Sequence, residues 1–359
     1  MEKVTGTFTQ IIQVQLCAPT VRSFTDYAYI FGWRHKCLIY DHFVLNNYGN
    51  LFFIDYCEAN SRSTYRLDLF PGPSLRKLAQ LGVLSARGHD LWRDLYGNEL
   101  NIFDFLREKL ALNECCQIVL DCFYLRGTAP YKTTHHVHQY LVTALDVSRK
   151  RVGLTGYFDL REDDYGLQWI SYNEFIQALD WKHDVGAHYG QRVHATWSYR
   201  YAESFKINVE FRHKFDSQRT LQQFKDYLNG TFSINQVGAH NRSIEGMTVS
   251  FGIKVYDRLQ EWLEILARGA SIDFRICRLV WEHKVLVVEK VEFLTKQCGY
   301  VIHRMVLTQL QEVARLASEF RLLIFSFDRI RSPDILRKAS RCLNKCRELE
   351  ILAYGRICS

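Results

Sequence analysis

Proline, basic clusters and long apolar runs are all scarce in this sequence. Its 359 residues include only 5 prolines, and its basic residues form no block of five or six. No stretch reaches the roughly 18 apolar residues that a membrane-spanning helix requires. The 46 Lys and Arg are interleaved with 39 Asp and Glu, so the net charge of +7 is spread along the chain. We therefore expect no membrane and no nucleic acid among the partners.

Motifs that bind nucleotides or mark common hydrolases are also missing. There is no Gly-rich phosphate loop, no GxGxxG after a strand and no GxSxG elbow, so nucleotide-dependent and α/β-hydrolase chemistry lack support. The 11 cysteines are scattered and include no CxxC pair. Without a secretory signal at the N-terminus, this spacing indicates reduced thiols in a cytoplasmic protein. No cofactor is expected.

The composition and length predict a folded chain with two cores. Apolar residues make up 47% of the sequence, which is enough to bury a core that offsets chain entropy. The length exceeds that of a usual single core. We expect an α+β protein with a boundary near residue 185, giving an α+β domain over 1–185 and a mainly helical domain over 186–359.

Several segments of the first half have a clear period. Residues 99–112 carry apolar side chains at helical spacing, and the runs 115–125, 138–147 and 151–160 are rich in β-branched and aromatic residues, which predicts three strands. The polar break between the last two favours a hairpin turn. Ser171 and Glu174 form a capping box, which predicts that a helix begins there.

Beyond residue 220 the pattern is almost entirely helical. Four segments carry apolar residues three and four positions apart: 253–266, 273–294, 301–325 and 333–352. Ser332 and Pro333 supply an N-cap and a first helical residue for the last of them.

A set of motifs in the middle of the chain resembles the butirosin biosynthesis protein H family. The segment 118–160 has an apolar strand that ends near an Asp and a Tyr, then a Tyr-Lys loop, a His-x-x-His pair and two strands; the matching residues are Asp121, Tyr124, Tyr131, Lys132, His135 and His138. The segments WISYNEFIQAL and YDRLQEWL and the triplet Glu282, His283, Lys284 extend the resemblance to about two thirds of the chain. Proteins of that group occur with non-ribosomal peptide and polyketide biosynthesis.

The resemblance implies a papain-like N-terminal domain, an antiparallel sheet with helices, that carries a cysteine-histidine dyad. His138 matches the general base at the start of a strand, and Cys17 lies before an expected helix, where such folds place the nucleophile. Gln13 is the matching oxyanion-hole residue. Asp159 is the candidate orienter of the imidazole, although Gly156 is the alternative occupant of that position.

The alternatives to this dyad stay open at the level of sequence. The three histidines at 135, 136 and 138 are also compatible with an exposed polar loop, and Cys17 with a buried structural thiol. His135, Tyr131, Glu282 and His283 are further cleft candidates, the last two with the alternative of a polar girdle on a core helix. A zinc site is disfavoured. On a strand, His136 and His138 point to one face of the sheet and His135 points to the other, so at most two of the three could bind the same metal ion. No metal is expected.

The resemblance implies natural-product biosynthesis as the function. We expect an acyltransferase that moves an acyl group from a carrier-protein thioester to an amine, with His138 shuttling the proton to and from the acceptor. Its partners are then an acyl or peptidyl carrier protein and a small-molecule acceptor. The competing hypotheses are a catalytically decayed binding or scaffold protein, and a cysteine peptidase or hydrolase that uses the same residues with water.

Overall fold

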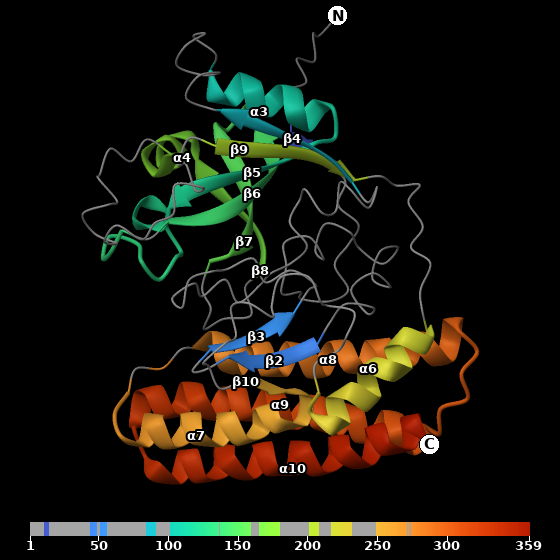
Figure 1. The fold of residues 1–359 in the computed structure, drawn as a ribbon. Helices are drawn as coiled ribbons and strands as arrows, with labels where there is room; N and C mark the ends of the chain where they lie inside the picture. The colour runs from blue at the N-terminus through green and yellow to red at the C-terminus, as the bar shows by residue number, and fades with distance from the viewer. Residues whose placement is uncertain are drawn as a thin grey trace, which may run out of the picture. The chain divides into compact units, whose positions relative to one another are not determined.

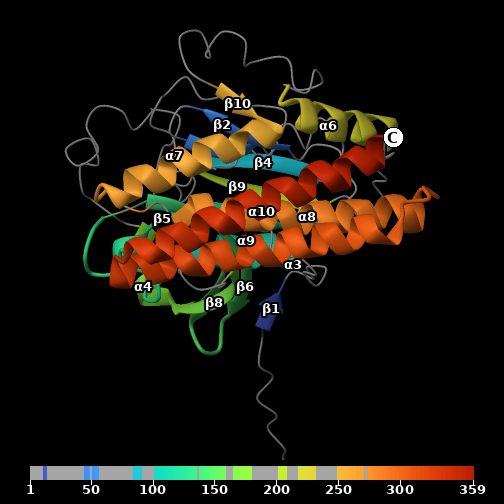
Figure 2. The same cartoon turned by 90° about the horizontal axis from the view of Figure 1, so that it is seen from below.

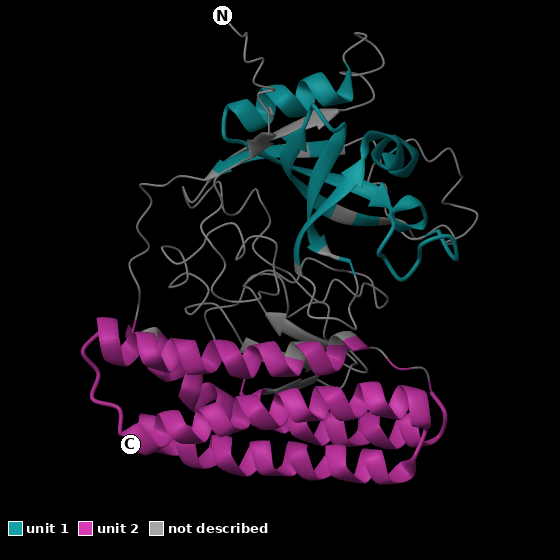
Figure 3. Cartoon of the chain, turned by 180° about the vertical axis from the view of Figure 1, so that it is seen from behind, with its two compact units in different colours: residues 1–17, 75–211 teal, residues 18–74, 212–359 magenta. Residues whose placement is uncertain are grey.

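The computed structural model describes residues 11–13, 44–48, 51–55, 84–90, 101–135, 137–158, 165–179, 201–207, 217–231, 249–270, 272 and 274–359. The chain divides into two compact units (Figure 3). The first unit comprises residues 1–17 and 75–211, and the second comprises residues 18–74 and 212–359. The two units are described separately below.

An antiparallel sheet of seven strands forms the centre of the first unit (Figure 1). The strands are β1 (Ile11–Gln13), β4 (Leu84–Asp90), β5 (Cys115–Asp121), β6 (Val137–Asp146), β7 (Arg151–Tyr157), β8 (Tyr165–Ser171) and β9 (Tyr201–Ile207). Their order is β4-β9-β5-β6-β7-β8, and β1 pairs with β6. All seven residues of β5 are buried, as expected of a strand in the middle of a sheet.

Strand β6 pairs with three other strands. Its first part, up to Val142, pairs with β5, and its last three residues pair with β1, while β7 occupies the opposite edge. The register with β7 shifts between Val142 and Ala144, which marks a β-bulge at Thr143. The buried hydroxyls of Thr143 and Thr155 lie 2.8 Å apart and so satisfy each other.

Two helices pack on this sheet. Helix α3 (Ile102–Ala111) buries four apolar residues on one face, and the side chain of Asn101 accepts a hydrogen bond from the Phe103 amide at its start. Helix α4 (Tyr172–Leu179) begins with the predicted capping box, in which Ser171 and Glu174 bond each other reciprocally. The Phe103 and Tyr172 rings stack with centroids 3.6 Å apart, so the two helices cover the same face of the sheet.

The described part of the second unit combines five helices with a small antiparallel sheet. The helices are α6 (Ser217–Asn229), α7 (Val255–Ala267), α8 (Phe274–Gln297), α9 (Arg304–Ile330) and α10 (Pro333–Cys358). Strands β2 (Val44–Tyr48) and β3 (Leu51–Asp55) pair with each other, and β10 (Val249–Phe251) pairs with β2; a 3-10 turn, η5 (Gly252–Lys254), links β10 to α7. Helices α9 and α10 lie side by side along their length (Figure 2).

Glu350 on α10 is the polar centre of this helical core and is fully buried. Its carboxylate pairs with Lys284 of α8 at 2.9 Å and accepts hydrogen bonds from the hydroxyls of Tyr227, Tyr256 and Tyr354. A buried carboxylate is tolerated only when it is paired and hydrogen-bonded, and here both conditions are met. The network joins α6, α7, α8 and α10.

The predicted α+β class is confirmed, and so are the hairpin between β6 and β7 and the Ser332-Pro333 start of α10. The units differ from the predicted halves 1–185 and 186–359 in two places. Strand β9 lies beyond residue 185 but pairs with β4 and β5 in the first unit. Strands β2 and β3 precede residue 185 but belong to the second unit, which adds a sheet to the predicted helices.

Candidate functional site

A group of polar side chains lies at one end of the β5–β6 pair. Strand β5 ends at Asp121 and β6 begins at Val137, and these two residues face each other across the ladder. The next pair along is Leu120 with His138. His135 directly precedes this ladder, so two of the predicted histidines and Asp121 lie at the same end of two neighbouring strands.

Asp121 holds His135 through a short contact between side chains. The Asp121 Oδ2 atom lies 2.6 Å from His135 Nδ1, and its Oδ1 accepts a hydrogen bond from the Phe123 amide at 3.0 Å. The carboxylate is 1% exposed, whereas the His135 side chain is 25% exposed. An ionised carboxylate only accepts hydrogen bonds, so in that state of Asp121 the His135 Nδ1–H is the donor.

Aromatic rings enclose the His135 imidazole. The Phe123 ring stacks on it with centroids 4.3 Å apart, and Tyr124 approaches it at a tilt. The Lys132 ammonium lies over the rings of Phe123, Tyr124 and Tyr131, at 5.2, 5.4 and 5.7 Å from their centroids. Tyr131, a predicted cleft residue, is therefore a half-buried neighbour of Lys132. Stacking on Phe123 orients the imidazole plane, and the Lys132 ammonium lies over the same aromatic cluster.

The loop between the two strands is held by its own hydrogen bonds. The Thr128 hydroxyl donates to the carbonyls of Cys122 and Leu125, and the Lys132 amide donates to the Phe123 carbonyl. Lys132 adopts a left-handed conformation with φ of 55°, which is uncommon for a residue other than glycine. Lys132 and His135 both contact the Phe123 ring.

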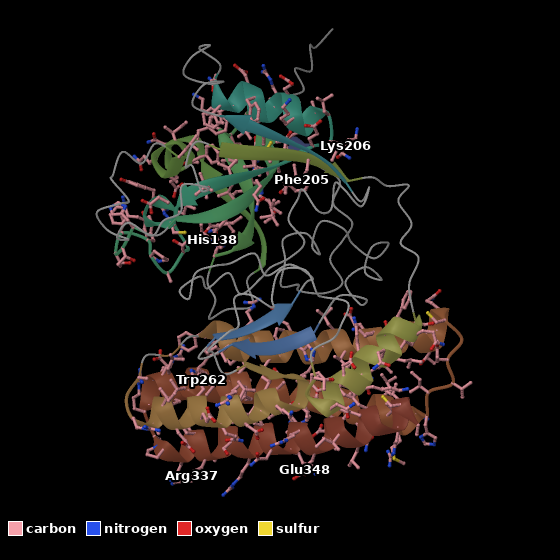
Figure 4. The ribbon with its side chains drawn as sticks, in the orientation of Figure 1. His138, Phe205, Lys206, Trp262, Arg337 and Glu348 are labelled. Atoms are coloured by element: carbon pink, nitrogen blue, oxygen red, sulfur yellow. The ribbon has the colours of Figure 1, made fainter. Side chains whose placement is uncertain are left out.

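His138 lies on β6 and is exposed (Figure 4). Its ring meets the edge of Tyr140, two residues along on the same face of the strand, at 5.3 Å between centroids. Tyr140 is buried, its hydroxyl lies 3.2 Å from the Cys122 sulfur, and its ring stacks on Phe158. His138, the predicted general base, therefore contacts a tyrosine whose hydroxyl and ring both have neighbours of their own.

The described cysteines of the first unit do not have the properties of a nucleophile. Burial raises the pKa of Cys122 to about 12, and it raises that of Cys115 to about 12 as well. Burial also raises the pKa of Cys116. Because only the thiolate attacks an acyl group, these three thiols are inert near neutral pH. Cys17, the predicted nucleophile, lies outside the described residues.

The position expected for the acidic orienter is sterically occupied. A Cβ atom at Gly156 would lie 3.0 Å from Cδ1 of the Tyr140 ring. A side chain at position 156 would therefore fit only if the Tyr140 ring shifted by a few tenths of an ångström. Asp159, the other candidate, lies outside the described residues.

Gln13 ends strand β1, and its backbone faces Ala144 of β6. Strand β1 runs antiparallel to β6, so its C-terminal end points toward the end of β6 that carries His138. On the N-terminal side of Ala144, the same edge of β6 pairs with β5, beginning with Cys116 opposite Val142. The structure thus brings the strand of Gln13 beside the strand of His138.

Glu282 and His283 lie on α8 in the second unit. Both are buried. Glu282 pairs with Arg278 at 2.7 Å, and the His283 ring stacks on Tyr227. Burial lowers the pKa of His283 well below its usual range, and the charges of Lys284 and Lys290 lower it further. These residues form part of a buried polar stripe on a core helix.

Asp121 is the residue whose role sequence reasoning missed. It was recognised as part of the motif, but its contact with His135 spans 14 positions and depends on the 3-10 turn η2 (Cys122–Tyr124). The available signal was a carboxylate at the end of an otherwise apolar strand, because such a group needs a partner once it is buried.

Comparisons with known proteins add no family. The chain matches no protein-family model, and a search of curated proteins found no match. Within the described residues, no group of three or more His, Cys, Asp or Glu side chains is placed to hold a metal ion. In the same part of the chain, no helix is long and apolar enough to cross a membrane.

Proposed function

We propose that this protein is a papain-like acyltransferase of natural-product biosynthesis. Cys17 takes an acyl group from a carrier-protein thioester and passes it to an amine. His138 removes the Cys17 thiol proton and returns a proton to the departing carrier thiolate. Gln13 and backbone amides stabilise the oxyanion.

The observation that carries this proposal is the pairing of β1 with β6. Strand β1 runs from Ile11 opposite Asp146 to Gln13 opposite Ala144, so its C-terminal end points toward the end of β6 that carries His138. His138 lies six positions from Ala144, about 20 Å along β6. The exposure of His138 also supports the role of a base that meets substrate.

The inert thiols of the first unit support the choice of Cys17 by elimination. Cys115, Cys116 and Cys122 are buried with raised pKa values, so a cysteine near His138 has to come from elsewhere in the chain. A carrier protein is acidic in character, and the positive net charge of this chain favours such a partner.

The test is the mass of the intact protein after incubation with acetyl, hexanoyl and glycyl thioesters of N-acetylcysteamine. We expect one acyl adduct that maps to Cys17, that is lost in Cys17→Ser and that persists in Cys358→Ser, a matched control in the second unit. An adduct that survives in Cys17→Ser would contradict the assignment of the nucleophile. The absence of any adduct on the folded wild-type protein would contradict covalent catalysis.

A binding or scaffold protein is the second candidate, and the environment of Gly156 favours it. The Tyr140 ring fills the space in which a papain-like enzyme of this pattern would carry an acidic orienter. In that case a phosphopantetheinylated carrier protein would bind wild type and Cys17→Ser equally well, and neither protein would form an adduct. The mass experiment therefore separates the two functions.

A further inference from the structure

We infer that the rings of Phe123, Tyr124 and Tyr131 form a binding site for a quaternary ammonium group, and that the Lys132 ammonium occupies this site in the absence of ligand. The ligand class is a small amine whose nitrogen carries only alkyl groups. The site is independent of the proposed acyl transfer, and neither Cys17 nor a histidine proton takes part in it.

Three aromatic rings converge on the same ammonium group. The Lys132 Nζ atom lies 5.2 Å from the Phe123 centroid, 5.4 Å from that of Tyr124 and 5.7 Å from that of Tyr131. All three distances are within the roughly 6 Å at which the face of a ring attracts a cation. Among the residues that the structure describes, the other cations lie over one or two rings.

The walls of this site are held by the backbone rather than by the lysine side chain. Phe123 and Tyr124 belong to the turn η2, and the Asp121 carboxylate accepts a hydrogen bond from the Phe123 amide at its start. The Phe123 and Tyr124 rings meet edge to face, with centroids 5.1 Å apart. The Tyr131 amide donates to the Thr128 carbonyl. Rings that are positioned before a ligand arrives lose little conformational entropy on binding.

The Lys132 side chain is an occupant that a ligand can displace. It is exposed, and within the described part of the chain its ammonium forms no ion pair. An exposed cation–π contact is weak, and a primary ammonium is compact and strongly hydrated, so leaving the rings for water costs it little. The three rings are half-buried, so part of each is open to solvent.

A quaternary ammonium group suits these rings better than the lysine does. It carries the same charge but has no N–H donor, so it gives up less hydration when it enters between the rings. Lysine and ligand then compete for one position, and removal of the lysine side chain should raise the affinity for the ligand. If Lys132 were instead a wall of the site, its removal would lower that affinity.

The experiment measures the binding of choline to the full chain by a saturation-transfer NMR titration, with 3,3-dimethylbutan-1-ol as a probe of the same shape without the charge. We expect choline to bind at least about tenfold more tightly than this neutral probe. Tyr124→Ala and Tyr131→Ala should each weaken choline binding by about threefold or more, and Lys132→Ala should strengthen it by about threefold. Nε-trimethyl-lysine is the second charged probe, and the tighter of the two distinguishes an amino-alcohol ligand from a modified side chain.

The control is Lys109→Gln, which removes a lysine that lies over a single ring, that of Phe105, and should leave choline binding unchanged. Circular dichroism shows whether each variant folds. If Tyr124→Ala does not, Lys132→Ala carries the test, because its side chain is exposed. The site is overturned if neither wild type nor Lys132→Ala binds choline, if the neutral probe binds equally well, or if Lys132→Ala binds choline more weakly. None of these results bears on acyl transfer.

Discussion

Tyr140 is a buried residue of the first sheet with several side-chain contacts. Its hydroxyl contacts Cys122, its ring stacks on Phe158, and its edge meets His138. Gly156 leaves room for that ring on β7, and its own partner on β8 is Gly166. The two glycines face each other across the ladder but have different surroundings, which makes them a matched pair for mutation.

Gly156→Ala should destabilise the protein by about 1 to 3 kcal/mol, because the new Cβ would lie 3.0 Å from the buried Tyr140 ring, whose contacts with Cys122 and Phe158 oppose the shift that would relieve the overlap. Gly166→Ala should be neutral or stabilise by up to about 1 kcal/mol, since a Cβ there meets nothing within 4 Å and the unfolded chain loses entropy. Urea unfolding of both variants checks this. Equal effects of the two substitutions would show that Tyr140 does not set the constraint.

Asp146, at the end of β6, has a pKa well below that of an ordinary aspartate. Burial raises its pKa, but hydrogen bonds from the Arg149 amide, the Arg151 guanidinium and the Ser148 hydroxyl outweigh that effect and lower the pKa to about 2. A carboxylate with a lowered pKa in the folded state contributes stability above its unfolded value of 3.8, and this contribution is lost as the pH falls through about 2.

Asp146→Asn should therefore lower the melting temperature at pH 7, with a loss of about 1 to 3 kcal/mol for the charged hydrogen bonds. The difference from wild type should shrink as the pH falls below about 4 and vanish near pH 2. Thermal unfolding across this range measures it, with the exposed Asp104→Asn on α3 as control. A difference that is constant with pH would show that the charge of Asp146 is not responsible.

At the scale of elements, one buried ion pair joins the helices of the second unit. Lys284 lies 1% exposed and Glu350 is not exposed at all, and three tyrosine hydroxyls complete the shell. Burial and the Glu350 charge raise the pKa values of Tyr227, Tyr256 and Tyr354, so all three act as neutral donors. Every member of the network contacts a residue on another helix or one turn away.

Glu350→Ala should destabilise the protein by about 3 to 5 kcal/mol, because it leaves the Lys284 charge buried without its carboxylate. Glu348→Ala, two residues earlier on the exposed face of α10 (Figure 4), should change stability by less than about 0.5 kcal/mol. The double variant Lys284→Met/Glu350→Leu should recover most of the loss. Denaturant unfolding decides this, and a mild effect of Glu350→Ala would argue against a charged pair.

The sequence predicts an element well when the residues that determine it are close together in the chain, and poorly when they are far apart. The capping box of Ser171 and Glu174 and the Ser332-Pro333 helix start are local signals, and both are confirmed. The pairing of β9 with β4 spans more than a hundred positions and its pairing with β5 more than eighty, and no local pattern reveals either. In the site, the pattern indicated both histidines, but the Asp121 contact required the fold of the intervening loop.

At the scale of the whole molecule, both units are assembled from separate stretches of sequence. A boundary near residue 185 follows from the change in period along the chain, from alternating to helical. Strand pairing does not follow that change, since β2 pairs with β3 and β10 rather than with the larger sheet. A domain can therefore be helical in most of its sequence and still be completed by strands from the other end of the chain.

This interleaving has a consequence for biosynthesis. The ribosome makes β2 long before its partner β10, which follows Tyr48 by about 200 residues, a delay of roughly 10 to 40 seconds at ordinary translation speed. During that interval the edge of β2 that later binds β10 is unpaired, and the last residues of the first unit are made before β10. The order of synthesis thus makes the second unit the later one to be completed.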